Sequence, residues 1–207
     1  MIPRVSPIQI IPSAGRPVTQ NQAGWLVIES FEPGSDFEAG LVDLSHRPKA
    51  LVQGPSVQKL GVALPGQALW TGKAWVGRIS SEAAVIFDLN GPMDQAWPHQ
   101  DHNDMTDGWA LLGIFGRRAT DVLARLVAVD VERREINGAL ILTARCHGMN
   151  LQIINPKSKH PGYLLACDRS YGQSLYDACL HVGHHVGLIP VGVKKFRSWM
   201  ADSGFLS

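Results

Sequence analysis

The sequence predicts an α+β protein in which antiparallel sheets carry helices on one face. The expected elements follow the order βαββ, βα and βββα, in which strands that succeed one another favour antiparallel pairing. In addition, a unit of strand, glycine turn and helix occurs twice, with its turns at Gly54 and Gly116. This internal similarity predicts two pseudo-repeated lobes.

The first part of the chain is expected to begin with an arm. Residues 1–23 are rich in Pro, Gln and Ser, which favours an extended segment that lies over another surface. The elements expected next are a strand at 23–31, a turn at 32–35, a short helix or turn at 36–42, a strand at 49–53 and a helix from Pro55 to about residue 63.

Two strands, at 74–79 and 83–87, precede a polar segment at 90–107 that we interpret as a surface loop. We place the boundary between the lobes here, which gives an N-terminal lobe with its arm at 1–103 and a C-terminal lobe at 104–207. The second lobe begins with the apolar strand 109–115. The elements expected after it are a helix to about 129, strands at 139–145 and 150–154 in a hairpin, a strand at 161–167 and a helix at 171–186 that Gly187 closes.

Composition excludes several classes of protein. Of the 207 residues, 45% are apolar and 18% charged, as expected for a globular chain, and the formal charge of +1 provides no field for nucleic acid or an anionic membrane. We find no apolar run long enough to span a bilayer and no secretory signal. Three cysteines without a close pair indicate a reducing, cytoplasmic environment.

Four segments, in order, resemble the glycine-cleavage T-protein (aminomethyltransferase) superfamily of folate-binding proteins. They lie between about Ala39 and Gly192, and their order and spacing carry the resemblance. The segments are Ala39-Gly-Leu-Val-Asp-Leu-Ser-His46, Gly54-Pro-Ser-Val57 with Leu60, Trp109 to Leu126, and Tyr163 to Gly192. Within the last of these, Arg169 to Asp177 is similar to a segment of the gamma subunits of heterotetrameric sarcosine oxidases.

The resemblance implies two lobes and a role beside folate chemistry. Family transferases carry an Asp-rich segment after a Gly-Gly turn, whereas this chain has only Asp88 at the corresponding distance, and it ends shortly after Gly192. We therefore expect a non-catalytic, gamma-type accessory subunit of a sarcosine oxidase-like or N-methyl amino acid-oxidising complex, docked on a large flavoprotein subunit. The alternatives are a stand-alone folate-dependent aminomethyltransferase or folate-binding protein, and a generic α+β interaction module.

Three residues are the candidates for a folate site. Asp88 follows an apolar run and is expected at a strand end, as a functional carboxylate or as the cap of the turn at Asn90. Trp75 and Arg78 lie on one strand and are interpreted either as a stacking surface for a planar ligand or as part of an interface. Because Gly113 to Gly116 lacks the GxGxxG spacing, we expect no flavin or nicotinamide bound by this chain alone, and tetrahydrofolate is the one cofactor that the resemblance implies.

Two other residue patterns are interpreted as structural. Asp43, Ser45 and His46 are the residue types of a catalytic triad, but neighbours on a strand point to alternate faces, so a turn bonded to backbone groups is favoured. No catalytic residue other than Asp88 is nominated. Metal binding is considered and not favoured for two groups, which are His181, His184 and His185 on the last helix, and Asp94, His99, Asp101, His102 and Asp104 in the loop.

Overall fold

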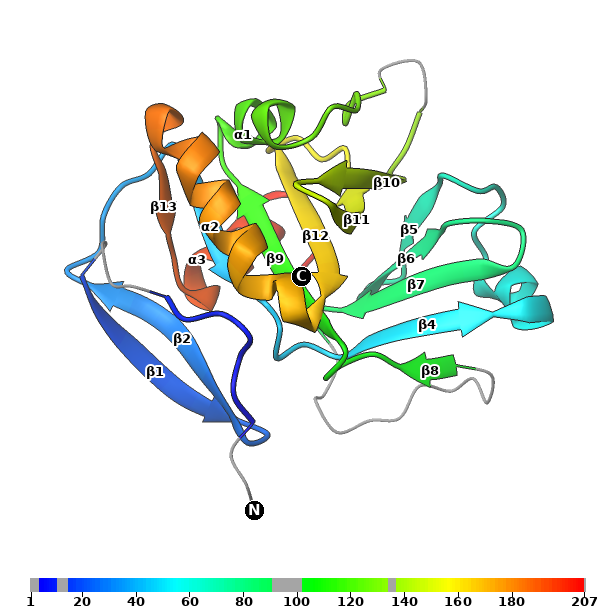
Figure 1. Ribbon diagram of the computed structural model, residues 1–207, viewed down its shortest axis with the longest axis horizontal. Helices are drawn as coiled ribbons and strands as arrows, with labels where there is room; N and C mark the ends of the chain where they lie inside the picture. Colours follow the sequence, from blue (N-terminus) through cyan, green and yellow to red (C-terminus); the bar gives the residue numbers. More distant parts are fainter. Residues whose placement is uncertain (1–3, 11–14, 91–101, 134–136, 207) are drawn as a thin grey trace.

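The computed structural model describes residues 4–10, 15–90, 102–133 and 137–206, which form three sheets. In Figure 1 a six-stranded sheet lies in the middle, with a five-stranded sheet on one side and a two-stranded hairpin on the other. The predicted α+β class is confirmed, because every pair of neighbouring strands is antiparallel except one. In the described ranges no helix has the length and apolar character needed to cross a membrane.

The six-stranded sheet draws strands from both halves of the chain. In spatial order its strands are β10 (Leu140–Cys146), β11 (Met149–Asn155), β12 (Gly162–Asp168), β9 (Trp109–Phe115), β3 (Ala39–Asp43) and β13 (Leu188–Pro190). β3 and β13 form the parallel pair. Since β3 precedes all the other strands of this sheet in sequence, the N-terminal half supplies one of its interior strands. The lobe boundary at 103/104 stays a prediction.

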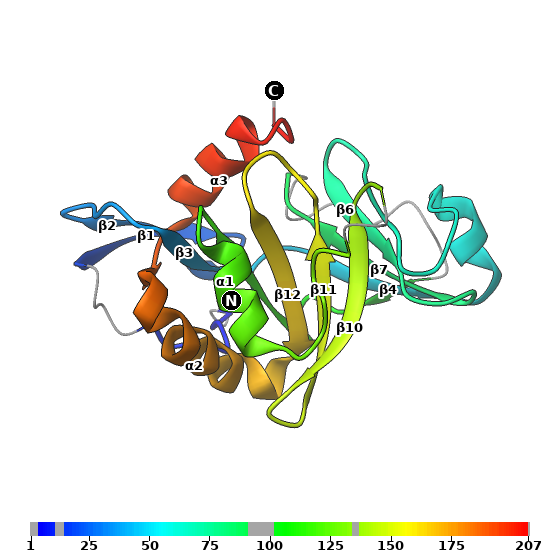
Figure 2. The same cartoon turned by 90° about the horizontal axis from the view of Figure 1, so that it is seen from above.

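Both faces of the six-stranded sheet are covered. On β9, Ala110, Leu112 and Ile114 point to the face that α1 (Ala119–Leu126) and α2 (Gly172–Gly183) cover. Leu111 and Phe115 point to the opposite face, where α3 (Val193–Asp202) packs. Figure 2 shows α2 and α3 on opposite sides of the sheet. The expectation of helices on one face therefore holds for α1 and α2 but not for α3, to which the sequence analysis assigned no element.

The five-stranded sheet is built from the middle of the chain. Its strands, in spatial order, are β5 (Ala68–Trp70), β6 (Ala74–Arg78), β7 (Ala83–Asp88), β4 (Lys49–Gln53) and β8 (His102–Asp104). The 3₁₀ helix η1 (Gly54–Leu60) covers one face with Val57 and Leu60. The other face shares a hydrophobic core with β10, β11, β12 and α3. The two larger sheets thus have one core in common.

The two larger sheets are also joined through their backbones. The amide of Ala68 donates to the carbonyl of Ala139 at 2.9 Å, and the amide of Ile141 donates to Gly66 at 2.9 Å. These bonds link the start of β10 to β5, the edge strand of the other sheet. Neither of those edges is therefore fully open.

The hairpin consists of β1 (Arg16–Gln22) and β2 (Trp25–Glu32) and extends from the body of the molecule (Figure 1). β2 alternates, with Trp25 and Val27 buried and Leu26 67% exposed. β1 is almost wholly exposed, and among the described strands it pairs with β2 alone. The hairpin is therefore attached to the core through one face of β2.

Local sequence predicted the long apolar strands and missed five others, namely β1, β3, β5, β8 and β13. β1 was expected as part of an extended arm, but its polar residues form a strand because β2 offers a partner. Residues 36–42 were expected as a helix or turn, yet β3 begins at Ala39, and its short apolar run does not distinguish strand from helix. β13 was not predicted. The last predicted helix, 171–186, appears as η2 (Arg169–Tyr171), α2 and η3 (His184–Val186).

The two copies of the predicted repeat occupy equivalent places in separate sheets. β4 leads through Gly54 into η1, and β9 leads through Gly116 into α1. Both glycines have positive φ, 74° and 116°. A Cβ on Gly54 would meet nothing within 4 Å, whereas one on Gly116 would lie 2.6 Å from the carbonyl oxygen of Glu38. Gly116 is thus required by close packing as well as by backbone conformation.

This pair of glycines provides a matched test. We expect Gly54→Ala to lower the free energy of unfolding by about 1 kcal/mol, because only backbone strain is added. Gly116→Ala should cost about 2 to 4 kcal/mol, since the added methyl also collides with Glu38. Urea denaturation of the two variants and the wild type measures the difference, and equal costs would show that the contact with Glu38 is relieved without strain.

Candidate functional site

A buried polar segment connects the two larger sheets. We call residues Asp43–Lys49 the crossover, because they carry the chain from β3 in one sheet to β4 in the other. Four of its polar side chains are buried, namely Ser45, His46, Arg47 and Lys49. Buried polar groups require hydrogen-bonding or charged partners. The crossover is therefore a candidate for a functional site.

Asp43 and Ser45 form a turn bonded to neighbouring segments. One carboxylate oxygen of Asp43 accepts the Ser45 amide at 2.9 Å, and the other accepts the hydroxyl of Ser6. The Ser45 hydroxyl accepts the amide of Leu111 at 3.2 Å. Within the described residues, no hydrogen bond joins His46 to Asp43 or Ser45. The groups are thus arranged as the structural interpretation predicted, and not as a triad.

His46 is held in its neutral form. Burial, together with the neighbouring charges of Arg47, Lys49 and Arg197, lowers the pKa of His46 from 6.5 to about 3. A histidine with this pKa stays uncharged at neutral pH and can donate one hydrogen bond and accept another.

Lys49 is the most unusual residue of the crossover, because its side chain is completely buried. Its ammonium group donates to the carbonyl of Ser45 at 2.7 Å and to that of Arg47 at 2.8 Å. Burial lowers the pKa of Lys49 from 10.5 to about 7, although the charge of Asp43 opposes this shift. Sequence analysis did not single out Lys49. Its only signal was a lysine at the start of a buried strand.

Asp88 lies at the end of β7, as predicted, and is 3% exposed. Its carboxylate oxygens lie 3.6 Å from the guanidinium of Arg47 and 3.6 Å from the ammonium of Lys73. One oxygen also accepts the amide of Asn90 at 3.1 Å, which caps the following turn. The carboxylate is therefore engaged in charge pairing and in the cap. A contact between Asp88 and folate stays a prediction.

Trp75 and Arg78 do not share a face, because they are three positions apart on β6 and side chains alternate along a strand. Trp75 packs into the common core against Trp70 and Phe205. The guanidinium of Arg78 donates to four backbone carbonyls, those of Val62, Ala63, Ser80 and Ser81. The two side chains therefore do not form one surface, and a contact of either residue with folate stays a prediction.

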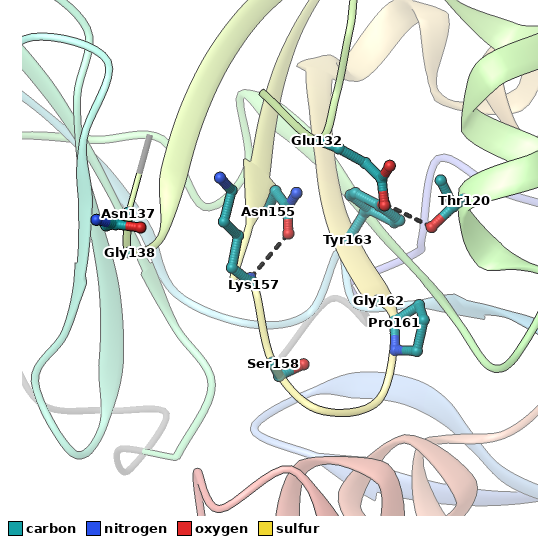
Figure 3. A pocket seen from close by; sticks show the side chains of 10 residues that line it. All are labelled: Thr120, Glu132, Asn137, Gly138, Asn155, Lys157, Ser158, Pro161, Gly162 and Tyr163. Carbon is teal, nitrogen blue, oxygen red and sulfur yellow. Dashed lines mark hydrogen bonds between the residues drawn. The ribbon is translucent and has the colours of Figure 1, made fainter. Parts of the chain in front are cut away.

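An open polar pocket of about 430 Å³ lies beside β12 and α1 (Figure 3). The hydroxyls of Thr120 and Tyr163 form a hydrogen bond of 2.8 Å at one side. On the other side the amide of Lys157 donates to Asn155 at 2.8 Å. The volume is typical of small-molecule sites. No motif marked this pocket in the sequence, since its lining comes from the ends of elements that are far apart in the chain.

Within the described ranges, no three His, Cys, Asp or Glu side chains are grouped as a metal would require. His181, His184 and His185 lie on exposed positions of α2 and η3. Of the loop candidates, His102 and Asp104 belong to β8, while Asp94, His99 and Asp101 lie outside the described residues. The three cysteines are buried free thiols in the core that α1 and α2 cover, with Cys179 on α2 itself. Burial raises the pKa of Cys167 to about 12.

Comparison with known proteins identifies the class of fold. No model of a known protein family matches the chain. A solved structure described as heterotetrameric sarcosine oxidase from Corynebacterium sp. U-96 in complex with pyrrole 2-carboxylate contains a chain of similar fold. The TM-score is 0.58 and the identity 12%, over 73% of this chain and 87% of that chain. The fold is thus one found in a sarcosine oxidase.

A curated relative points to the same class of protein. Sarcosine oxidase subunit alpha from Rhizobium meliloti (strain 1021) is 27% identical over 135 residues, which are 60% of this chain. The chain spans only 13% of the length of that relative. The predicted resemblance to sarcosine oxidase-related proteins is therefore confirmed, while the links to folate and to the T-protein stay predictions.

The neutral state of His46 predicts how stability depends on pH. Since the folded pKa is about 3 and the ordinary value 6.5, the unfolded chain binds more protons between these values. The stability due to neutral His46 is present above pH 6.5 and is lost as the pH falls towards 3, by up to about 1.4 kcal/mol per pH unit. We expect a shallower loss in His46→Leu, measured by urea denaturation at several pH values.

The matched control is His184→Leu at an exposed position, whose pH profile should follow that of the wild type. If His46→Leu and the wild type lose stability with the same slope, His46 does not hold a depressed pKa.

Proposed function

We propose that this chain is a gamma-type, T-protein-like accessory subunit of a sarcosine oxidase-like or other N-methyl amino acid-oxidising complex. The observation that carries the proposal is the fold that this chain shares with a chain of heterotetrameric sarcosine oxidase. The matching region covers 87% of the sarcosine oxidase chain. The sequence similarity to a sarcosine oxidase alpha subunit supports the same class of complex. In this role the chain carries out no chemistry itself and braces a large flavoprotein subunit that is coupled to folate one-carbon metabolism.

The distribution of polar groups supports a structural role. In the crossover, the hydrogen bonds of Asp43, Ser45 and Lys49 go to other parts of the same chain. Asp88 is paired with Arg47 and Lys73. These groups stabilise the junction between the two larger sheets and so keep the outer surfaces of those sheets in a fixed relation, as a docking subunit requires.

The hairpin supports contact with a second polypeptide. It extends from the body of the molecule, and it carries Val18 and Leu26, two of the exposed large hydrophobic residues. Burial of these two side chains against a second polypeptide would be favourable, because it removes apolar surface from water. We therefore propose that the hairpin contributes to docking on the flavoprotein subunit.

The alternative function is folate binding by the chain alone, as a folate-binding protein or aminomethyltransferase. The open pocket beside Tyr163 favours it, because its volume suits a small molecule and its walls carry hydroxyl, amide and charged groups. The family resemblance instead implies Asp88 as the key carboxylate, which lies at the end of β7 and is not among the residues that line this pocket.

The subunit proposal predicts that the chain is isolated with a partner. An affinity tag on the full chain, expressed in its native source, should retain a larger polypeptide that carries flavin absorbance. Tagging through the C-terminus leaves the hairpin free. A lone monomeric species with no flavoprotein in the eluate would contradict the proposal.

Titration calorimetry with tetrahydrofolate separates the two functions. The subunit proposal predicts no tight binding to the isolated chain, whereas the alternative predicts tight binding that Asp88→Ala abolishes. Because removal of Asp88 leaves Arg47 buried without its carboxylate, a loss of about 3 to 5 kcal/mol of stability is expected for that variant. Asp88→Asn keeps the shape and an acceptor for Asn90, and serves as the folded comparison. Circular dichroism checks that each variant is folded.

A further inference from the structure

A small cavity lies between the N-terminal segment, the hairpin and the crossover. Its volume is about 60 Å³, several times the roughly 10 to 15 Å³ that a single water needs. Apolar walls come from Ile8 of the N-terminal segment, Val27 of β2 and Val42 of β3. Asp43 and His46 add polar groups from the crossover. None of the functions considered above uses this cavity.

Trp25 lines the same cavity and has an unsatisfied hydrogen-bond donor. The side chain is 1% exposed, and its indole N–H has no protein partner. The guanidinium groups of Arg4 and Arg169 lie 5.9 and 5.7 Å from the centre of its ring, so charged groups stack on the indole. Buried donors without a partner are rare in folded proteins. The indole N–H is therefore a donor that an acceptor in this cavity would satisfy.

The other polar groups of the cavity restrict the charge of that acceptor. Asp43 already accepts the hydroxyl of Ser6 and the amide of Ser45, and its carboxylate would repel an anion. His46 is buried among Arg47, Lys49 and Arg197, whose charges oppose the entry of a cation. An uncharged guest with an oxygen acceptor fits both the donor of Trp25 and the apolar walls.

We propose that this cavity is a binding site for a small neutral guest whose oxygen accepts the hydrogen bond of Trp25. The volume admits water or a one- or two-carbon alcohol, aldehyde or amide, and excludes larger ligands. This proposal does not depend on the proposed subunit function, because it follows from the cavity and the unpartnered indole alone.

The N-terminal segment forms one wall of the cavity. The Ser6 hydroxyl bonds to Asp43, the carbonyl of Val5 accepts Arg169, and the amide of Gln9 donates to Gln173 at 2.7 Å. Ser6 is the only one of these anchors that itself lines the cavity among the described residues. We therefore infer that the hydrogen bond between Ser6 and Asp43 must break before a guest enters or leaves the cavity.

Nuclear magnetic resonance of the full chain with labelled tryptophan tests the site. The indole signal of Trp25 is identified by its loss in Trp25→Phe. We expect slow hydrogen exchange at this N–H together with either a cross-peak to a bound water or a saturable shift on titration with methanol. The first result identifies water as the guest and the second a small organic oxygen compound. Tert-butanol, which is too large, should cause no saturable shift.

The proposal is overturned if the Trp25 indole shows neither a water cross-peak nor a methanol shift. The role of the N-terminal segment is tested by Ser6→Ala, which should speed exchange at the Trp25 indole by roughly tenfold, because one hydrogen bond of the closed segment is lost. Ser174→Ala, at an exposed position of α2, is the matched control and should leave exchange unchanged. Equal exchange in the two variants would overturn the assignment of Ser6 as the gate.

Discussion

The ammonium group of Lys49 holds the chain where it passes between the two larger sheets. A lysine with no solvent contact is costly unless its protons are bonded, and here the carbonyls of Ser45 and Arg47 accept them. Those carbonyls belong to a turn that no sheet or helix satisfies, so one side chain supplies the partners that the backbone lacks. The crossover from β3 to β4 is thus braced from within, at the point where the chain passes from one sheet to the other.

Packing reinforces the same junction. The core common to the two larger sheets contains Trp75 and Phe87 from one sheet, Leu111 and Leu164 from the other, and Trp199 from α3. Backbone bonds between β5 and β10 add a second connection at the far end of the sheets. The polar crossover and this apolar core act together, since the crossover sets the orientation and the core supplies the larger part of the buried apolar surface.

Sequence reasoning succeeded where a signal was local and failed where it depended on distant partners. The strand and turn at Trp109–Gly116 could be predicted because an apolar run ends at a glycine. α3 was missed although its buried residues recur at helical spacing, as Val193, Phe196, Trp199 and Met200. β13 could not be predicted, because its three residues acquire their role only by pairing with β3. The end of a strand was predicted correctly for Asp88, but its pairing with Arg47 joins residues 41 positions apart. Lys49 and Trp25 gave no local sign of their unusual surroundings.

The place of β3 in the six-stranded sheet also has a consequence for how the chain folds. β3 lies between β9 and β13. The backbone hydrogen bonds of residues 39–43 are therefore complete only when both of these strands, which extend to residue 190, have formed. Such non-local pairing carries a high contact order and slows folding. During synthesis, the first half of the chain emerges before the strands that pair with the apolar strand β3 have been made. Because each half supplies strands to one sheet, we expect a cut between them to yield fragments that need each other to become ordered.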